Sequence, residues 1–259
     1  MKLITLNTWG GRVLEPLLQF TQTKLQEADV ICLQEVLSAK QALPGVEVCT
    51  NTLEQLLPLL DDYRFVYNSN VVDTLTSKIS QPGLRYGNAI FVRKDLRLRA
   101  SQNHYIVKYP GDSFDLDGGE DHPRALQVVQ LTDEEGNDFA VANYHGYWSN
   151  GPKTDDATRI EQSQRIRQVL DRLGEEYILC GDFNLLPSTQ SLAILRDGLS
   201  DMVQKYELVT TRSELYKRID YAPFADYVLT SPGVKDLSFS ALDEVVSDHL
   251  ALELEFELS

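Results

Sequence analysis

The sequence predicts an α/β fold, a four-layer sandwich in which two mixed β-sheets pack face to face and helices flank them. Short apolar runs typical of strands occur along the whole chain of 259 residues, and helical stripes occur in both halves. No linker, repeat or low-complexity tract divides the chain. Its 42% of hydrophobic residues can fill a sizeable core. We therefore expect one domain spanning residues 1–259.

The first part of the chain alternates strands and helices. Strands are expected at Lys2–Leu6 and at Asp29–Leu33, and the second is a continuous apolar run, typical of a strand buried on both faces. Apolar residues recur at helical spacing through Arg12–Glu27, which predicts a helix. Thr52 and Gln55 have the spacing of a capping box, so a short helix should begin there.

The rest of the chain is richer in strand signals. Strands are expected at Asn88–Val92, Asn103–Lys108, Ala125–Leu131, Phe139–His145, Tyr177–Cys180, Tyr227–Thr230, Val234–Ser240 and Ala251–Leu258. The DEEGN segment between residues 133 and 137 indicates a hairpin turn. Helices are expected at Thr158–Leu173, capped by Asp155 or Asp156, and at Ser188–Leu195.

Composition argues against several classes of protein. The net charge is -15, with 24 basic and 39 acidic residues, and no run of basic residues suggests a patch for a nucleic-acid polymer. No apolar stretch is long enough to cross a membrane, and the N-terminus lacks the pattern of a secretory signal. Three cysteines do not make a disulfide framework, and Cys32 and Cys180 lie in apolar runs. We therefore expect a cytoplasmic protein with reduced thiols.

Polar side chains follow five of the apolar segments, at one end of each. These residues are Asn7, Glu35, Asn143, His145, Asp182, Asn184, Asp248 and His249. If those ends converge, they form a cluster of carboxylates, amides and imidazoles. Clusters rich in carboxylate and amide oxygens suit Mg²⁺ or Mn²⁺ better than zinc.

Eight motifs occur in an order that matches a known family: LNTWGG, LQEV, YGNAIFV, PRALQVV, NYHG, GDFN, ADYVLTSP and SDHLAL. With them the chain resembles the endonuclease/exonuclease/phosphatase superfamily from residue 3 to about residue 257. The resemblance implies a DNase I-like fold. It also implies hydrolysis of a phosphate ester by water that a divalent cation activates, so that no serine or cysteine nucleophile is needed.

The resemblance also implies roles for the carboxylates. Glu35 matches the main metal ligand of the family, with Asn7 beside it, and Asp248 matches a further carboxylate of the metal site. Asp182 and Asn184 match the GDxN motif. In that motif the aspartate orients or activates water and the asparagine holds a phosphoryl oxygen.

His249 corresponds to the catalytic histidine of the family, which an aspartate in an Asp-Tyr strand orients. Two such pairs begin at Asp220 and Asp226, and we favour Asp226 because an apolar strand follows it. An imidazole paired with a carboxylate stays basic enough to handle a proton near neutral pH. His145 is expected to contact the phosphate or to assist the leaving group, and Arg124 matches a basic residue near the site.

Two further residues are expected to contact substrate. Asn143 shares its strand end with His145. Lys153 follows that strand in a loop, where it is either a substrate contact or an ordinary surface lysine. His104 is interpreted as structural, and the role of His122 stays open.

Three functions compete. The first is a Mg²⁺-dependent phosphoesterase (Mn²⁺ is possible) acting on a small-molecule or lipid-derived ester; the second is a DNA endonuclease or exonuclease. The third is a binding protein that kept the fold and lost catalysis, which the intact motif set disfavours. The segments Tyr67–Tyr86 and Tyr109–His122, taken as loops, carry only Lys78 and Arg85 as basic residues, fewer than a nuclease groove needs. The acidic segment 111–121 would repel a long polyanion; as a calcium loop it lacks most of the required positions. The sequence does not distinguish a monoester from a diester, one metal from two, or the oligomeric state.

Overall fold

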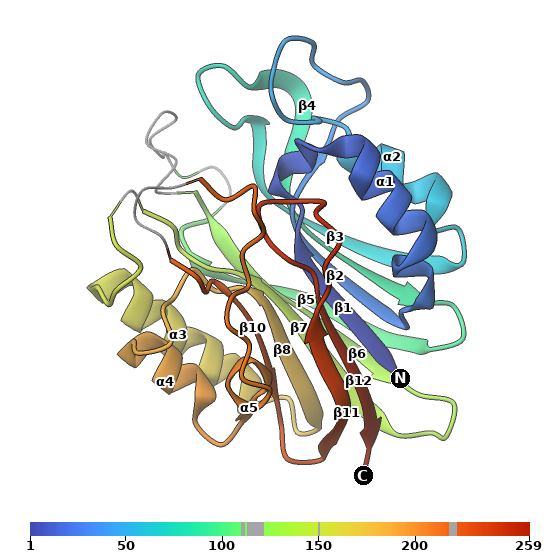
Figure 1. The fold of residues 1–259 in the computed structure, drawn as a ribbon, viewed down its shortest axis with the longest axis vertical. Helices are drawn as coiled ribbons and strands as arrows, with labels where there is room; N and C mark the ends of the chain where they lie inside the picture. The colour runs from blue at the N-terminus through green and yellow to red at the C-terminus, as the bar shows by residue number, and fades with distance from the viewer. Residues whose placement is uncertain (110–111, 113–121, 150, 218–221) are drawn as a thin grey trace.

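Two six-stranded sheets pack against each other in the computed structural model, and helices cover their outer faces (Figure 1). The structure describes residues 1–109, 112, 122–149, 151–217 and 222–259. The expected four-layer α/β sandwich is thus confirmed, and both sheets are mixed.

The first sheet joins the two ends of the chain. Its strands are, in spatial order, β11 (Val234–Ala241), β12 (Leu252–Leu258), β1 (Lys2–Asn7), β2 (Val30–Ser38), β4 (Ser80–Arg93) and β3 (Tyr63–Thr74). β1 runs parallel to β2 and antiparallel to β12. The first strand is therefore held between a near neighbour in sequence and the last strand.

The second sheet carries the middle of the chain. Its strands are, in spatial order, β5 (Arg97–Val107), β6 (Arg124–Thr132), β7 (Asp138–His145), β8 (Glu176–Asp182), β10 (Asp226–Thr230) and β9 (Ser200–Asp201). β7 and β8 are parallel, and their last residues, His145 and Asp182, are in register. β10 runs the other way, so that Asp226 begins its strand opposite Asp182.

Side chains of the central strands alternate between two apolar layers. Leu3 and Cys32 belong to the large cluster that includes the second sheet. Ile4 and Ile31 belong to a second cluster, which the helices of the first half complete. All four are fully buried, as expected for strands covered on both faces.

The helices form the two outer layers. They are α1 (Leu14–Thr23) and α2 (Thr52–Leu56) on the first sheet, and α3 (Ala157–Leu170), α4 (Gln190–Arg196) and α5 (Met202–Lys205) on the second. Asp156 caps α3 by accepting a hydrogen bond from the Arg159 amide at 2.8 Å. Asp155 instead accepts from the amides of Gln190 and Ser191 at the start of α4. Within the described ranges, no helix has the length and apolar character needed to cross a bilayer.

Two expectations about local structure were wrong, and the first helix has narrower bounds than expected. The helix expected from Arg12 begins at Leu14, because the chain first makes a 3₁₀ turn through glycines with positive φ. The capping box does not form: the Thr52 hydroxyl donates to the Cys49 carbonyl at 2.6 Å instead. The segment 67–86 is mostly not a loop, since β3 and β4 pair as a long hairpin through it. β3 is an edge strand with half-exposed residues on both faces, so its apolar pattern is weak.

Candidate active site

A bulge in β2 presents Glu35. The pairing of β2 with β4 shifts between Leu33 and Val36, and Glu35 has a φ of 56°, in the left-handed region. The hydroxyl of Thr8 contacts the carbonyl oxygens of Gln34 and Glu35 at 3.0 and 3.1 Å. Such irregular backbone re-aims a side chain and is often found at functional sites. Here it places the carboxylate of Glu35 beside the end of β1.

Asn7 joins carboxylates that come from the two different sheets. Its amide nitrogen donates to Glu35 Oε1 at 3.0 Å and to Asp182 Oδ2 at 2.9 Å. Its amide oxygen accepts from the Trp9 backbone N–H at 2.9 Å. Asn7 therefore positions the two carboxylates, and its oxygen, which accepts one hydrogen bond, keeps a second lone pair. Its role as a metal ligand stays a prediction.

The GDFN segment is shaped by its glycine. Gly181 has a φ of 129°, and a Cβ there would lie 2.0 Å from the Tyr144 carbonyl oxygen, so only glycine fits. Phe183 packs between the rings of Tyr144 and Tyr227, with centroids 5.5 and 5.3 Å away. Because Phe183 points into the core, Asp182 on one side of it is free to face the site.

Asn184 follows in a left-handed conformation with a φ of 54°. Its backbone N–H donates to Asp182 Oδ1 at 3.0 Å, and its side-chain oxygen accepts from Lys153 Nζ at 2.8 Å. Lys153 is only 6% exposed. The sequence left open whether this lysine is an ordinary surface residue, and the structure places it inside, against the GDxN motif.

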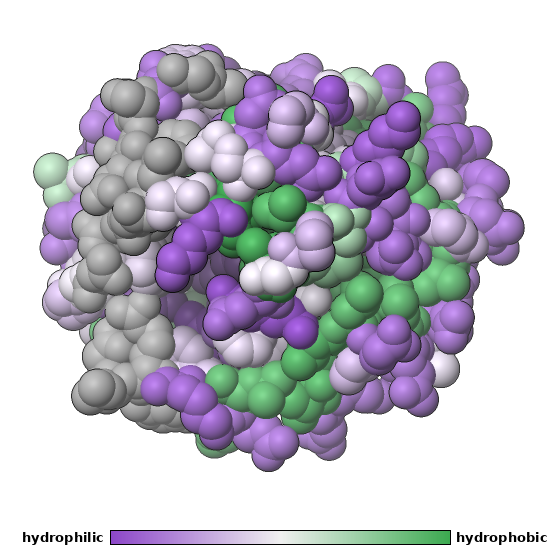
Figure 2. Space-filling model, turned by 90° about the horizontal axis from the view of Figure 1, so that it is seen from above, coloured by the Kyte–Doolittle hydropathy of each residue, from purple (hydrophilic) through white to green (hydrophobic). Residues whose placement is uncertain are grey.

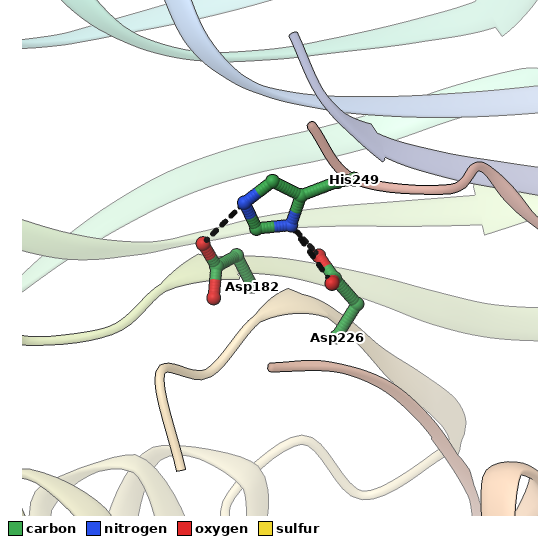
Figure 3. Close-up of side chains that lie close together, drawn as sticks. All are labelled: Asp182, Asp226 and His249. Atoms are coloured by element: carbon green, nitrogen blue, oxygen red, sulfur yellow. Dashed lines mark hydrogen bonds and ion pairs between the residues drawn. The ribbon is translucent and has the colours of Figure 1, made fainter. Parts of the chain in front are cut away.

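His249 lies between two aspartates (Figure 3). Its Nδ1 is 2.8 Å from both carboxylate oxygens of Asp226, and its Nε2 is 3.6 Å from Asp182 Oδ2. The Thr211 hydroxyl donates to Asp226 Oδ2 at 3.0 Å and so fixes that carboxylate. Asp226 is thus the aspartate that contacts the histidine. The other candidate, Asp220, lies outside the described residues.

The pKa of His249 reflects opposing effects. Burial and the guanidinium of Arg212 lower it, whereas the carboxylates of Asp226, Asp182 and Asp248 raise it, and the pKa ends above its usual value. Asp248 approaches Nε2 to 3.8 Å. A histidine with this balance can hold a proton near neutral pH and release it within the site.

His145 has the opposite character. Burial and the charge of Arg124 hold its pKa well below the usual value, so the ring is neutral at pH 7. Arg124 Nη1 lies 3.0 Å from His145 Nδ1, and His145 Nε2 lies 3.8 Å from both Glu35 Oε1 and Asp182 Oδ2. Two histidines in one site therefore have pKa values moved in opposite directions.

The carboxylates differ in the same way. Burial opposes ionisation of Asp182, but the charges of His249 and Lys153 hold its pKa below the usual range. Burial raises the pKa of Glu35, and the negative charge of Asp248 raises it further, although the hydrogen bond from Asn7 acts against both. A cation near Glu35 and Asp248 would relieve this repulsion.

A divalent cation fits the donor atoms at this edge. Carboxylate oxygens of Glu35, Asp248 and Asp182 are the ligand type that Mg²⁺ and Mn²⁺ prefer. Among the described residues, Asp182, Asp226 and His249 also offer ligand atoms within 4.8 Å of one another and could hold an ion. We read the Asp226–His249 contact as a hydrogen bond, because both oxygens sit at 2.8 Å from a nitrogen that can carry a proton.

Asn143 lies apart from this cluster. It is fully buried, and its amide nitrogen donates to the carbonyl oxygens of Leu33 and Ala89 at 3.1 and 3.2 Å. Its amide oxygen accepts from Gln34 at 2.8 Å. These bonds tie β7 to β2 and β4 of the other sheet. The expected contact of Asn143 with substrate stays a prediction, and the structure gives it a place between the sheets.

Sequence reasoning missed Arg212 and Thr211. Both lie on the segment before β10, where no apolar run or recognised motif marks them. Arg212 forms an isolated backbone bridge with His249, and its guanidinium contacts the imidazole Nε2. His122, which the sequence left open, packs edge-on to Tyr86 at 5.9 Å and lowers the pKa of His145.

Seen from the end of the sheets that is uppermost in Figure 1, the molecule is hollowed, and hydrophilic residues line the hollow (Figure 2). β1 and the parallel pair β7 and β8 end near this edge (Figure 1). The outer end of the site is thus suited to a polar ligand.

Comparisons with known proteins agree with this geometry. The sequence pattern of the Endonuclease/Exonuclease/phosphatase family matches residues 4–249. No curated protein sequence matches the chain.

Several solved structures have the same fold at low sequence identity. An endonuclease/exonuclease/phosphatase from Beutenbergia cavernae has a TM-score of 0.72 and 18% identity, over 100% of this chain and 72% of the other. A mannosyl-6-phosphatase from Bacteroides thetaiotaomicron has a TM-score of 0.72 and 16% identity, with 100% of both chains covered. The human Nocturnin catalytic domain with bound sulfate has a TM-score of 0.68 and 18% identity, over 100% of this chain and 93% of that domain.

These structures share the two mixed sheets and flanking helices, which makes the fold DNase I-like, and the family pattern spans nearly all of the chain. The chain belongs to the endonuclease/exonuclease/phosphatase family.

Proposed function

We propose that this protein is a divalent-metal-dependent phosphoesterase that hydrolyses a small-molecule or lipid-derived phosphate ester by attack of water. The observation that carries the proposal is the Asp226–His249–Asp182 arrangement at the converging ends of the two sheets. A carboxylate–imidazole pair beside an ionised aspartate can position water and exchange protons.

The cation is Mg²⁺, with Mn²⁺ as the alternative, and Glu35 and Asp248 would hold it with Asn7 beside them. When bound, such an ion neutralises phosphate charge and lowers the pKa of water. The position of Glu35 supports this assignment: burial raises the pKa of its carboxyl group, the nearby charge of Asp248 raises it further, and a cation would offset both effects.

The protein's own groups divide the remaining work. Asp182, kept ionised by its cationic neighbours, accepts a hydrogen bond from the attacking water and orients it. His249 exchanges a proton through Nε2 while Asp226 holds Nδ1. Asn184 and Lys153 lie together where they can donate to phosphoryl oxygens.

His145 acts as a neutral donor. Its Nδ1 faces Arg124, which can only donate hydrogen bonds, so the ring hydrogen is on Nε2 and faces the carboxylates. A phosphoryl oxygen or the leaving oxygen is the group that this N–H would meet. We therefore keep the role expected from the sequence, in which His145 contacts the phosphate or assists the leaving group, and assign it to the Nε2 hydrogen.

The preference for a small or lipid-derived ester rests on charge. The chain has a net charge of -15, which disfavours the many simultaneous phosphate contacts that duplex DNA requires. One structural neighbour is a mannosyl-6-phosphatase, which is consistent with a small substrate. DNA cleavage is the alternative that the experiment must separate.

The test compares turnover of a panel of small and lipid phosphoesters with nicking of plasmid DNA, at the same Mg²⁺ and salt concentrations. Asp182→Asn serves as the inactive control for contaminating hydrolases. We expect faster turnover on members of the panel. Rapid nicking of the plasmid without hydrolysis of any phosphoester in the panel would indicate a nuclease. Tight phosphate binding without hydrolysis of the plasmid or the panel would indicate a binding protein.

A further inference from the structure

Arg212 is a buried cation at the centre of the site. The residue is 6% exposed, and a backbone bridge to His249 holds it in place. One guanidinium nitrogen, Nη1, contacts His249 Nε2. The guanidinium lies over the ring of Tyr216, 4.3 Å from the centroid, which fixes the plane of the guanidinium. Its charge therefore faces the place where the imidazole meets substrate.

No carboxylate that the structure describes forms an ion pair with Arg212, and its Nε has no hydrogen-bond partner. Two other arginines are paired: buried Arg159 contacts Asp156, and half-buried Arg196 contacts Asp201 at 2.5 Å while lying 5.9 Å from the ring centre of Tyr227. Arg124, on the other side of the site, resembles Arg212, because it contacts an imidazole and its Nε has no hydrogen-bond partner among the described residues. A buried charge without a counter-ion is costly, so Arg212 is a site that an anion would complete.

A second cation lies close to the first. Asp182 lies between the two cations, Arg212 and Lys153: one of its carboxylate oxygens accepts from the Asn184 N–H, and the other is 3.6 Å from the His249 nitrogen that Arg212 contacts. Burial and the charge of Arg212 lower the pKa of Lys153 to about 8. Lys153 Nζ donates to the side-chain oxygen of Asn184 at 2.8 Å. Asn184 and Asn7 contact different oxygens of the Asp182 carboxylate. Two buried cations near one reacting centre favour an anion that carries more than one charge.

We propose that Arg212 is a specificity-determining residue: it donates to non-bridging oxygens of the substrate's phosphoryl group and, with Lys153, selects a terminal phosphate over a phosphodiester. The inference rests on the proposed phosphoesterase function and deepens it. A terminal phosphate presents three acceptor oxygens and carries nearly two charges at neutral pH. A diester carries one charge and has fewer oxygens free, so it gains less from a bidentate guanidinium and an ammonium group.

The experiment measures kcat/KM on p-nitrophenyl phosphate and on bis(p-nitrophenyl) phosphate with Mg²⁺, for the wild type, Arg212→Gln and Arg212→Lys. We expect Arg212→Gln to lower the value for the monoester about tenfold to a hundredfold, because a charged hydrogen bond is lost. The diester should lose less, so the ratio of monoester to diester turnover falls. Arg212→Lys should restore part of the ratio, since it keeps the charge without the planar fork. Arg196→Gln is the matched control, because Arg196 also lies over a tyrosine but outside the site.

The proposal is overturned if Arg212→Gln has the same ratio of monoester to diester kcat/KM as the wild type, provided that circular dichroism shows that all variants are folded. Binding of inorganic phosphate in the presence of Mg²⁺, measured by calorimetry, separates this result from failure of the proposed function. If the wild type hydrolyses neither ester, weaker phosphate binding by Arg212→Gln than by Arg196→Gln still supports the role of Arg212 in binding. Equal phosphate binding by these two variants contradicts it.

Discussion

Arg124 donates a hydrogen bond to Nδ1 of His145 across 3.0 Å, and this contact decides where the ring keeps its hydrogen. An arginine has no acceptor, so Nδ1 must be the unprotonated nitrogen and Nε2 must carry the hydrogen. His145 is thereby fixed as a neutral donor through Nε2. His249 has the opposite tautomer, because its Nε2 faces Arg212 and its Nδ1 faces the Asp226 carboxylate, so Nε2 is the nitrogen that can accept a proton.

The first prediction concerns the pH dependence that follows from this contact. The pKa of His145 is lower in the folded protein than in the unfolded chain, so below pH 6.5 the unfolded chain binds more protons. The free energy of unfolding should therefore decrease as the pH falls below about 6.5. Arg124→Gln removes the nearby charge, raises the pKa of His145 and should make this decrease smaller. Urea unfolding at several pH values, with chelator present, measures it. An unchanged pH dependence would show that Arg124 does not control this histidine.

The second prediction separates the members of the histidine pair. His249→Ala should lower kcat about a hundredfold or more, as expected for a general acid or base. Asp226→Asn should have a smaller effect, since an amide oxygen can still accept from Nδ1 but no longer raises the pKa of the ring. Steady-state kinetics across the pH range give both values. Asp220→Asn should change kcat little, and a large effect there would assign the orienting role to Asp220.

The third prediction is metal dependence. Chelation should abolish hydrolysis, and Mg²⁺ or Mn²⁺ should restore it, because the oxygen donors at Glu35 and Asp248 fit these ions. Glu35→Gln should raise the Mg²⁺ concentration needed for half-maximal activity while leaving the melting temperature little changed. Titration of Mg²⁺ into chelated protein measures it. Full activity in excess chelator would contradict the metal assignment.

The fourth prediction concerns the cost of burying Lys153. Its pKa of about 8, below the ordinary 10.5, means that the buried ammonium group destabilises the folded state. Lys153→Met should raise the free energy of unfolding at pH 7 by roughly 1–3 kcal/mol and at the same time weaken substrate binding. The unfolded wild type binds the extra proton between about pH 8 and 10.5, so the stability of the wild type relative to the Met variant should rise with pH through that range. Denaturant unfolding of both proteins at pH 7 and pH 10 tests this; a less stable Met variant at pH 7 would refute it.

Much of the fold was readable from the sequence because the central strands are covered on both faces. Leu3 and Ile4 point into different apolar layers, so β1 reads as a continuous apolar run. The edge strand β3 was missed for the opposite reason: its half-exposed side chains dilute the pattern. The start of α1 was predicted two residues too early, because glycines with positive φ form a 3₁₀ turn directly before it.

The candidate site shows the same division. Residues inside motifs at strand ends, such as Asp182 and His249, could be selected as candidates because their polar side chains interrupt apolar runs. Arg212 and Thr211 were not found, because only the tertiary fold brings their segment against β10 and His249. Sequence spacing also could not show that Asn143 uses its whole amide between the sheets.

The two hydrogen bonds from Asn7, to Glu35 and to Asp182, have a consequence for the order in which the site forms during folding. Glu35 lies in the same sheet as Asn7 and is synthesised early. Asp182 belongs to the other sheet and emerges from the ribosome much later. β1, which carries Asn7, also pairs on its other edge with β12, the last strand of the chain. Neither half of the sandwich alone holds the paired carboxylates, so a nascent or half-docked chain has no competent centre, and hydrolytic activity would begin only when the two sheets close.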